Sequence, residues 1–425
     1  MKENLLNDAS YCLGCIKKPC RNGCPLNNDI PSFIKKIKDS QYQESFNILS
    51  ETTVLPSICG RICSHSTQCQ GHCIRGIKSK PVNIGKLEST IGDISLKEDY
   101  PLPLLSNKKK NYKIAVIGSG PSSLTCAAFL ARHQYQVTIY EKYNTLGGLL
   151  VHGIPSFRLD KEIVFKNISK ILSLGIKVKY NQELGKNLLI SDLEKKYDAI
   201  YLGIGGNISN NMNIPGEHLK GVYSANKLLE TNNHPDYKDK YIIINGGGNV
   251  AMDISRTIKR LGAKEVTIVY RRSKNEMPVS QEELISAEKE GIKFIYQTNI
   301  IKVIGDSNVE GIECLKTNLV KEKNNPRLVP IDIENSNHII KCNYLIKAIG
   351  SHPDENILNT LDLTLNNSYL QVNEYNQTSK PYIFAGGDLI GTKKTVANAS
   401  RSGRDAAYNI IKYLEEKEIT KTITK

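Results

Sequence analysis

The feature that most restricts the fold is a pattern of strand, glycine-rich turn, helix and strand, and it occurs twice. The two copies are YKIAVIGSGPSSLTCAAFLARHQYQVTIYEK at 112–142 and YIIINGGGNVAMDISRTIKRLGAKEVTIVYRR at 241–272. In each copy a short apolar run precedes the glycines, and an apolar helical period over about five turns follows them. This pattern is typical of a Rossmann-like dinucleotide-binding unit. The sequence therefore predicts an α/β protein with two such units.

The first turn, GSGPSS, has the glycines that a bound pyrophosphate needs. Gly118 permits the tight turn, and Gly120 lets the backbone approach a pyrophosphate at the start of a helix, which Pro121 and Ser122 open. Ser123 stands where Gly or Ala is usual, and we expect it to be tolerated. The alternative is a strand-to-helix turn without a ligand, because a glycine pattern by itself is a weak signal.

An acidic residue follows the first turn at the distance that a dinucleotide site requires. Glu141 ends the second strand about 20 residues further on, where a carboxylate binds a ribose 2′-hydroxyl. A carboxylate at this place favours a cofactor with an unphosphorylated ribose, either NAD or FAD.

The second turn has different residues at the place of that acid. Tyr270 aligns with Glu141 and is followed by Arg271 and Arg272. Arginines bind a 2′-phosphate through paired charge-assisted hydrogen bonds, so this unit is predicted to take NADPH. The alternative is that both arginines are solvated surface charges. The turn residues expected to contact NADPH are Gly246, Gly247, Gly248, Asn249 and Val250.

Eight of the eleven cysteines precede residue 74, in the segments CLGCIKKPCRNGCP and CGRICSHSTQCQGHC. Such local crowding favours metal or cluster ligation over disulfides in a large chain with no secretory leader. The first segment resembles a ferredoxin arrangement, although four residues separate its second and third cysteines where two are usual. Structural zinc is the alternative, with His65 and His72 as further ligands.

The length, the net charge and the apolar runs of the chain restrict the class of protein further. The length of 425 residues predicts about three domains. Residues 99–111 combine prolines with a lysine run and are predicted to be a linker, after a region of short amphipathic helices such as 30–49. The net charge of +14 comes from lysines spread over the whole chain, so we expect no nucleic-acid partner. No apolar run has the length of a membrane span, and we expect a soluble, cytoplasmic protein.

These motifs, taken in order, resemble one family. The chain is similar to the small (beta) subunit of NADPH-dependent glutamate synthase and its FAD and iron–sulfur relatives. Those relatives include the electron-input half of dihydropyrimidine dehydrogenase and the large subunit of the bifurcating ferredoxin:NADP oxidoreductase. The motifs that carry the resemblance are CxxCxxxxCxxxCP, CGRICSHSTQCQGHC, VNIGKLE, GSGPSS, YEKYNTLGGLLVHGIPSFRL, GGGNVAMD, YRRSKNEMP and IFAGGD.

The resemblance implies FAD in the first unit, NADPH in the second and two 4Fe-4S clusters in a helical N-terminal domain. The implied domains are 1–105 for the clusters, 111–234 with 343–425 for FAD, and 235–342 for NADPH, inserted in the FAD domain. The ligands implied for one cluster are Cys12, Cys15, Cys20 and Cys73. Those implied for the other are Cys24, Cys63, Cys69 and Glu88, with Cys59 as a bystander. The residues implied to hold FAD, beyond the first turn, are Glu141, Lys142, Gly148, Leu149, Gly387, Asp388, Val396 and Ala397.

The function that the resemblance implies is electron transfer from NADPH to a partner chain, either a glutamate synthase large catalytic (alpha-like) subunit or another electron-accepting protein. The cofactors carry the hydride transfer, so no catalytic acid, base or nucleophile is expected. Alternatives are the electron-input subunit of a dihydropyrimidine dehydrogenase, a bifurcating transhydrogenase or a sulfide dehydrogenase. A non-catalytic nucleotide-binding redox sensor is a further alternative.

Overall fold

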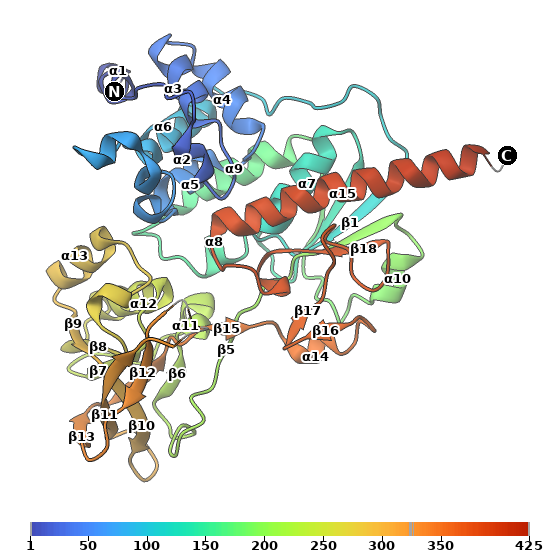
Figure 1. The fold of residues 1–425 in the computed structure, drawn as a ribbon. Helices are drawn as coiled ribbons and strands as arrows, with labels where there is room; N and C mark the ends of the chain where they lie inside the picture. The colour runs from blue at the N-terminus through green and yellow to red at the C-terminus, as the bar shows by residue number, and fades with distance from the viewer. Residues whose placement is uncertain (1, 323–324, 326, 424–425) are drawn as a thin grey trace. The chain divides into compact units, whose positions relative to one another are not determined.

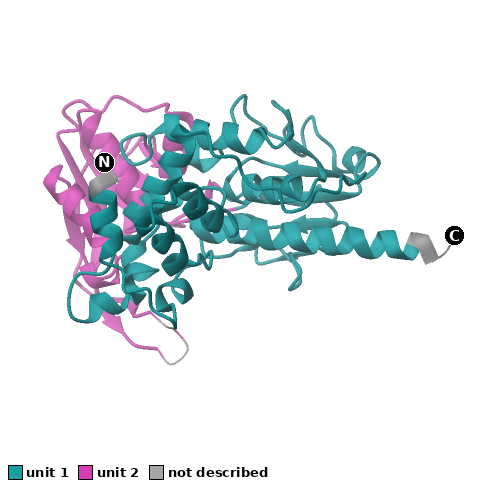
Figure 2. Ribbon diagram, turned by 90° about the horizontal axis from the view of Figure 1, so that it is seen from above, with its two compact units in different colours: residues 1–151, 156–206, 353–425 teal, residues 152–155, 207–352 magenta. Residues whose placement is uncertain are grey.

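A computed structural model describes residues 2–322, 325 and 327–423. The chain forms two compact units, of which one contains residues 1–151, 156–206 and 353–425 and the other contains 152–155 and 207–352 (Figure 2). The second unit is thus an insertion in the first. In the described part of the chain, no helix has both the length and the apolar character needed to cross a membrane.

The first unit begins with short helices, and the cysteines before residue 74 lie in these helices or in the loops between them (Figure 1). In α3 (Ile30–Lys38) four apolar residues at helical spacing face the core, among them Phe33 and Ile34. Ser40, at φ 57°, ends this helix before α4 (Tyr42–Ser50) begins, so the predicted amphipathic stretch is two helices. The other elements are α1 (Lys2–Ser10), α2 (Pro19–Asn22), α5 (Pro56–Ile62), η1 (His65–Thr67), η2 (Gln70–His72), η3 (Ile74–Ile77) and α6 (Ile84–Lys97).

A five-stranded parallel sheet forms the centre of the first unit, in the order β18-β4-β1-β2-β3. Its strands are β1 (Lys113–Ile117), β2 (Gln136–Tyr140), β3 (Lys177–Lys179), β4 (Ala199–Leu202) and β18 (Ile383–Ala385). The last strand comes from the tail of the chain, so the tail completes the first sheet. Helices α7 (Pro121–Arg132) and α15 (Val396–Ile423) pack against each other, with the rings of Phe129 and Tyr408 5.7 Å apart.

Smaller elements complete the first unit. They are α8 (Leu149–His152), α9 (Lys161–Leu172), α10 (Ile190–Glu194), α14 (Glu355–Leu358), β16 (Leu365–Asn366), β17 (Tyr369–Leu370) and η5 (Gly387–Ile390). The side chains of strand β18 alternate between two faces: Phe384 contacts the ring of Tyr413 on α15, whereas Ile383 and Ala385 join a core with β1 and β4.

The second unit also has a five-stranded parallel sheet, in the order β6-β14-β7-β8-β9. Ile242 and Ile244 of β7 face a helical layer, whereas Ile243 faces an antiparallel sheet built around β11. The parallel strands are β6 (Val222–Ser224), β7 (Tyr241–Asn245), β8 (Glu265–Tyr270), β9 (Lys293–Tyr296) and β14 (Tyr344–Lys347). The helices are α11 (Ala225–Thr231), α12 (Asn249–Arg260), η4 (Lys274–Glu276) and α13 (Gln281–Lys289). The remaining strands are β5 (Ile208–Ser209), β10 (Thr298–Ile304), β11 (Gly311–Val320), β12 (Val329–Asp332), β13 (His338–Lys341) and β15 (Ser351–His352).

Two details differ from the sequence-based expectation. The helices after the glycine turns, α7 and α12, have 12 residues each and are shorter than the predicted five turns. They end early because Gln134, at φ 67°, and Gly262, at φ 98°, turn the chain back into the next strand. The inserted unit is also wider than 235–342, because strands β6 and β14 on either side of that range already belong to its sheet.

Candidate functional site

The first glycine turn joins β1 to α7 and leaves open space at its centre. Gly118 has φ 90°, and a Cβ there would lie 2.6 Å from the carbonyl oxygen of Gly203. Gly120 has no neighbouring atom within 4 Å of where a Cβ would be. Gly148, at φ 51°, packs directly on Gly120, because its own Cβ would be 2.8 Å from the Cα of Gly120. Pro121 and Ser122 form the first helical turn of α7, as predicted.

Ser123 fits beside the turn because Gly203 has no side chain. The serine is fully buried, and its hydroxyl donates a hydrogen bond of 3.2 Å to the carbonyl of Gly203. A Cβ on Gly203 would collide with this hydroxyl. Serine is larger than the usual Gly or Ala at this position. It is accommodated because Gly203, which directly follows β4, has no side chain.

Glu141 is buried at the carboxyl end of β2 and is held by two donors. The hydroxyl of Ser119 donates to Glu141 Oε2 at 2.5 Å, and the backbone N–H of Tyr143 donates to Oε1 at 2.9 Å. Ser119 also accepts a bond of 2.9 Å from the N–H of Gly147. The carboxylate thus ties the glycine turn to the loop that carries Gly148 and the half-exposed Leu149 at the start of α8. The exposed Lys142 lies with its ammonium 4.6 Å from the ring centre of Tyr143.

The AGGD segment of the tail meets this turn from the other side. Gly387, at φ 69°, donates its N–H to the hydroxyl of Ser402 at 3.1 Å, and a Cβ there would lie 3.1 Å from the Cβ of Ser122. Burial raises the pKa of Asp388 above its usual value, and Lys394 opposes this shift. Helix α15 then begins at Val396, followed by the buried Ala397. The structure thus brings the predicted FAD residues from three distant parts of the chain to one edge of one sheet.

The second glycine turn has three glycines, and a side chain at each of them would have a different consequence. Gly246 has φ 139°, and its Cβ would collide with the carbonyl oxygen of Ala348. A Cβ on Gly247 would lie 2.6 Å from the ring of Tyr270. Gly248 has nothing within 4 Å and caps the start of α12, where Asn249 and Val250 form the first turn.

The arginines after β8 are joined by a third that the sequence analysis missed. Arg271 is exposed, and Arg272 donates from Nε to the carbonyl of Leu328 at 2.8 Å. Arg327 donates from Nη2 to the hydroxyl of Tyr270 at 3.2 Å and to the carbonyl of Glu276 at 2.8 Å. Arg327 lies far from the glycine turn in sequence and in no motif, so only the pairing of β11 with β12 brings it here.

Four predicted cluster ligands line one pocket in the N-terminal helices. The pocket contains Cys12, Cys15, Cys20 and Cys73, together with apolar residues of α3 and η3. Burial raises the pKa of the Cys20 thiol to about 11, and the charges of Cys12 and Cys73 raise it further. The first predicted ligand set is therefore brought together by the fold.

The second predicted set also gathers in one place, around Glu88. Burial raises the pKa of Glu88 to about 8, and a hydrogen bond of 3.2 Å from Asn28 Nδ2 opposes that shift. Burial, followed by the charge of Glu88, raises the pKa of Cys24 to about 11 and also raises that of Cys69. The thiol of Cys63 shares a hydrogen bond with Cys59, which raises the pKa of Cys63.

The two predicted ligand sets consist mainly of thiols. Within the described residues, no three His, Cys, Asp or Glu side chains are close enough to hold one metal ion. His72 is engaged by the carbonyl of Gln68, at 2.7 Å from its Nδ1. Thiolate-rich sets of four are the usual ligands of 4Fe-4S clusters.

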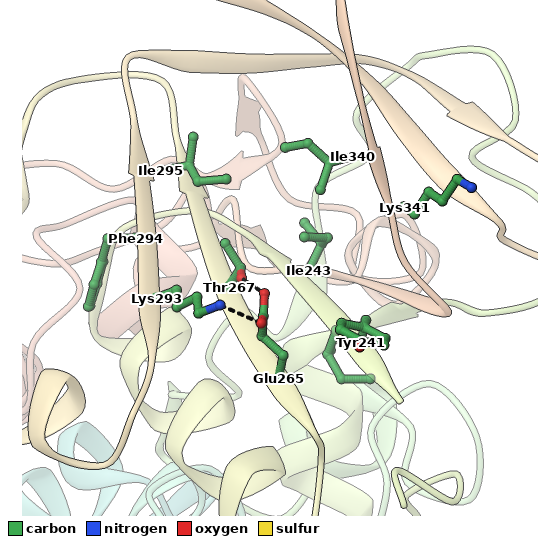
Figure 3. Close-up of a pocket in the computed structure, with 10 residues that line it drawn as sticks. Tyr241, Ile243, Glu265, Thr267, Lys293, Phe294, Ile295, Ile340 and Lys341 are labelled. Atoms are coloured by element: carbon green, nitrogen blue, oxygen red, sulfur yellow. Dashed lines mark hydrogen bonds and ion pairs between the residues drawn. The ribbon is translucent and has the colours of Figure 1, made fainter. Parts of the chain in front are cut away.

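One pocket of the second unit lies away from that unit's glycine turn. It has a volume of about 380 Å³ and is lined at the amino ends of β7, β8 and β9 by Tyr241, Glu265 and Lys293 (Figure 3). The glycine turn follows the carboxyl end of β7, where ligands of parallel sheets bind. The pocket in Figure 3 is therefore at the opposite edge of the sheet from the predicted NADPH residues.

Comparison with known proteins agrees with this geometry. Residues 112–403 match the family model of pyridine nucleotide-disulphide oxidoreductases, and residues 1–100 match that of the dihydropyrimidine dehydrogenase domain II, 4Fe-4S cluster. The glutamate synthase (NADPH) small chain of Escherichia coli K12 is 32% identical over 96% of this chain and 91% of its own length. That of Azospirillum brasilense is 31% identical over 98% and 90%.

Further similarity is found in other oxidoreductase subunits and in solved structures. The NADP(+)-dependent formate dehydrogenase subunit beta of Moorella thermoacetica is 31% identical over 96% of this chain and 61% of its own length. Mycobacterium tuberculosis FprA, solved with NADPH, has the same fold over 73% of this chain and 86% of its own, with a TM-score of 0.66 and 20% identity. From the two family matches and the near full-length identity, the chain belongs to the glutamate synthase small chain family of NAD(P)H-dependent FAD and 4Fe-4S oxidoreductases.

Proposed function

We propose that the chain is the electron-input subunit of an NADPH-dependent glutamate synthase. It would pass electrons from NADPH through FAD and two 4Fe-4S clusters to a large catalytic subunit, which forms glutamate from glutamine and 2-oxoglutarate. The observation that carries the proposal is the joint presence, in one chain, of two glycine turns and two gathered cysteine sets. The near full-length identity to two glutamate synthase small chains supports the choice of partner.

The proposed division of labour follows the predicted domains. Residues 1–105 hold the clusters, 111–234 with 343–425 hold FAD, and 235–342 hold NADPH, with the adjacent strands of its sheet. When bound, these cofactors supply hydride transfer at the flavin and one-electron transfer at the clusters.

The chain's own residues bind and orient the cofactors. At the first turn, the open space at Gly120 and the N–H groups of the first turn of α7, which helix geometry leaves without a partner inside the helix, suit a pyrophosphate. Ser119 and the N–H of Tyr143 hold the Glu141 carboxylate where it can accept from the ribose hydroxyls. We expect neither the FAD site nor the NADPH site to need a side chain that transfers a proton.

We assign Cys12, Cys15, Cys20 and Cys73 to one cluster, since they line one pocket. We assign Cys24, Cys63, Cys69 and Glu88 to the other. Cys59 lies beside Cys63 and is the rival of Glu88 as the last ligand.

We propose that Arg271, Arg272 and Arg327 together select the 2′-phosphate of NADPH. Arg271 is exposed, and Arg272 and Arg327 are fixed by backbone carbonyls that leave part of each guanidinium available. A guanidinium presents several N–H donors in a planar fork, which suits a phosphate.

An anaerobic titration tests the proposal. Protein reconstituted with iron, sulfide and FAD is titrated with NADPH and, separately, with NADH, while flavin absorbance is followed and iron, sulfide and flavin are measured. We expect NADPH to bleach the flavin, with two clusters per flavin. A flavin that stays oxidised with NADPH, or cysteines filled by zinc, would contradict the proposal.

A further inference from the structure

Two cysteine segments in the N-terminal helices expose large apolar side chains to solvent. Leu13 and Ile16 lie in the segment 11–21, with exposed fractions of 55% and 95%. Ile74 and Ile77 lie in the segment 73–81, with exposed fractions of 42% and 78%. Single exposed apolar residues are normal on protein surfaces, but such residues gathered around one site indicate an interaction surface.

The two segments contact each other directly. Tyr11 donates from its hydroxyl to the carbonyl of Lys80 at 3.0 Å, and Arg75 donates from Nε to the carbonyl of Tyr11 at 3.0 Å. The guanidinium of Arg75 also stacks 4.3 Å from the ring centre of Tyr11. These contacts join the two segments, and we call the four exposed apolar side chains, together with the two segments that carry them, the cysteine face.

The cysteine face borders the pocket of the first predicted ligand set. Leu13 and Ile74 line that pocket together with Cys12, Cys15 and Cys73. A protein bound to this face would therefore lie within a few side chains of those thiols.

The charge of the cysteine face has a single sign. Its two segments contain six lysines and arginines and no aspartate or glutamate. Lys18 and Arg21 are paired with Asp29. Lys17, Lys78 and Lys80 are exposed and form no ion pair with any described residue. An apolar centre with unpaired lysines around it fits a partner whose apolar patch is bordered by carboxylates.

The second ligand set, in contrast, is attached to the FAD side of the same unit. Arg404 donates from Nη1 to the carbonyl of Leu26 at 2.8 Å, and Arg401 donates to that of Pro25 at 3.4 Å. Both arginines belong to α15, which begins eight residues after Asp388 of the AGGD segment, and Pro25 directly follows Cys24. The Cys24 set is thus anchored next to the predicted flavin residues, and the Cys12 set is the one that reaches an exposed apolar surface.

We propose that the cysteine face is the docking surface for the electron-accepting partner, a protein with an acidic rim around an apolar patch. This inference rests on the proposed function and adds to it the place and the chemistry of the contact. The partner to which we commit is the glutamate synthase large chain.

The test measures the dissociation constant between the reconstituted chain and a purified glutamate synthase large chain, by sedimentation velocity. Ile16→Glu with Ile77→Glu places two negative charges in the apolar centre and is expected to weaken binding at least tenfold. Ile339→Glu, which changes a side chain of 66% exposure on β13, is the matched control and should bind as the unchanged chain does. Raising the salt concentration from about 0.05 to 0.3 M should weaken the complex, since exposed charges are then screened.

A second readout separates docking from electron input. Iron content and NADPH-dependent reduction of ferricyanide, a small acceptor, should be unchanged in both variants if only docking is affected. Equal binding by the unchanged chain and by Ile16→Glu with Ile77→Glu would overturn the docking proposal, whereas no binding by the unchanged chain would count against the glutamate synthase partner itself. Loss of NADPH-dependent ferricyanide reduction in the unchanged chain would instead refute the proposed function.

Discussion

Replacing Gly248 by alanine separates nucleotide binding from stability at the second turn. Gly248 precedes α12 with φ −94° and ψ −177°, a conformation that alanine adopts readily. A Cβ there has no neighbouring atom within 4 Å. The protein should therefore fold unchanged, while the new methyl group occupies the space into which a pyrophosphate would come.

The magnitudes can be worked out from these observations. Lower chain entropy in the unfolded state favours Gly248→Ala by about 0.4–1 kcal/mol. Alanine is a poorer helix cap than glycine, which costs about 0.5–1 kcal/mol, so the two effects nearly cancel. Losing one charge-assisted hydrogen bond to the pyrophosphate costs about 1.5–3 kcal/mol, which weakens binding by about 10-fold to 100-fold.

The assay compares two neighbouring glycines. Urea unfolding gives the stability, and calorimetric titration with NADP⁺ gives the affinity. Gly247→Ala is the contrasting variant, because its Cβ would lie 2.6 Å from the ring of Tyr270, which a bond of 3.0 Å to the carbonyl of Glu276 holds in place. This overpacking should destabilise the protein by about 1–3 kcal/mol. Wild-type affinity in Gly248→Ala would refute the reasoning, since the pyrophosphate would then not approach this turn.

Three further outcomes are expected. Arg271→Ala with Arg272→Ala should weaken NADPH binding far more than NADH binding, and equal losses would rule out the 2′-phosphate assignment. Arg327→Ala should weaken 2′,5′-ADP about tenfold in calorimetry and leave 5′-AMP unchanged, as expected for one lost charge-assisted hydrogen bond; an equal effect on both ligands would contradict its role. Glu88→Ala should lower iron content or change the electron paramagnetic resonance spectrum of one reduced cluster, whereas Cys59→Ser should not. The opposite pattern would make Cys59 the ligand.

Local sequence was enough to predict the two Rossmann-like units. The alternation of Ile242, Ile243 and Ile244 between two apolar layers follows from strand geometry, and the glycine positions follow from backbone conformation at the turns. The helix lengths were wrong because the positive-φ residues that end α7 and α12, such as Gln134, give no signal in the apolar period.

The sequence by itself determined the fold class and the family, because these depend on motifs read within a few tens of residues. Only the tertiary structure decided which distant residues meet. It placed Arg327 against Tyr270 and matched Ser123 to the missing side chain of Gly203. Such contacts are set by strand pairing and close packing between segments far apart in the chain, which no local pattern encodes.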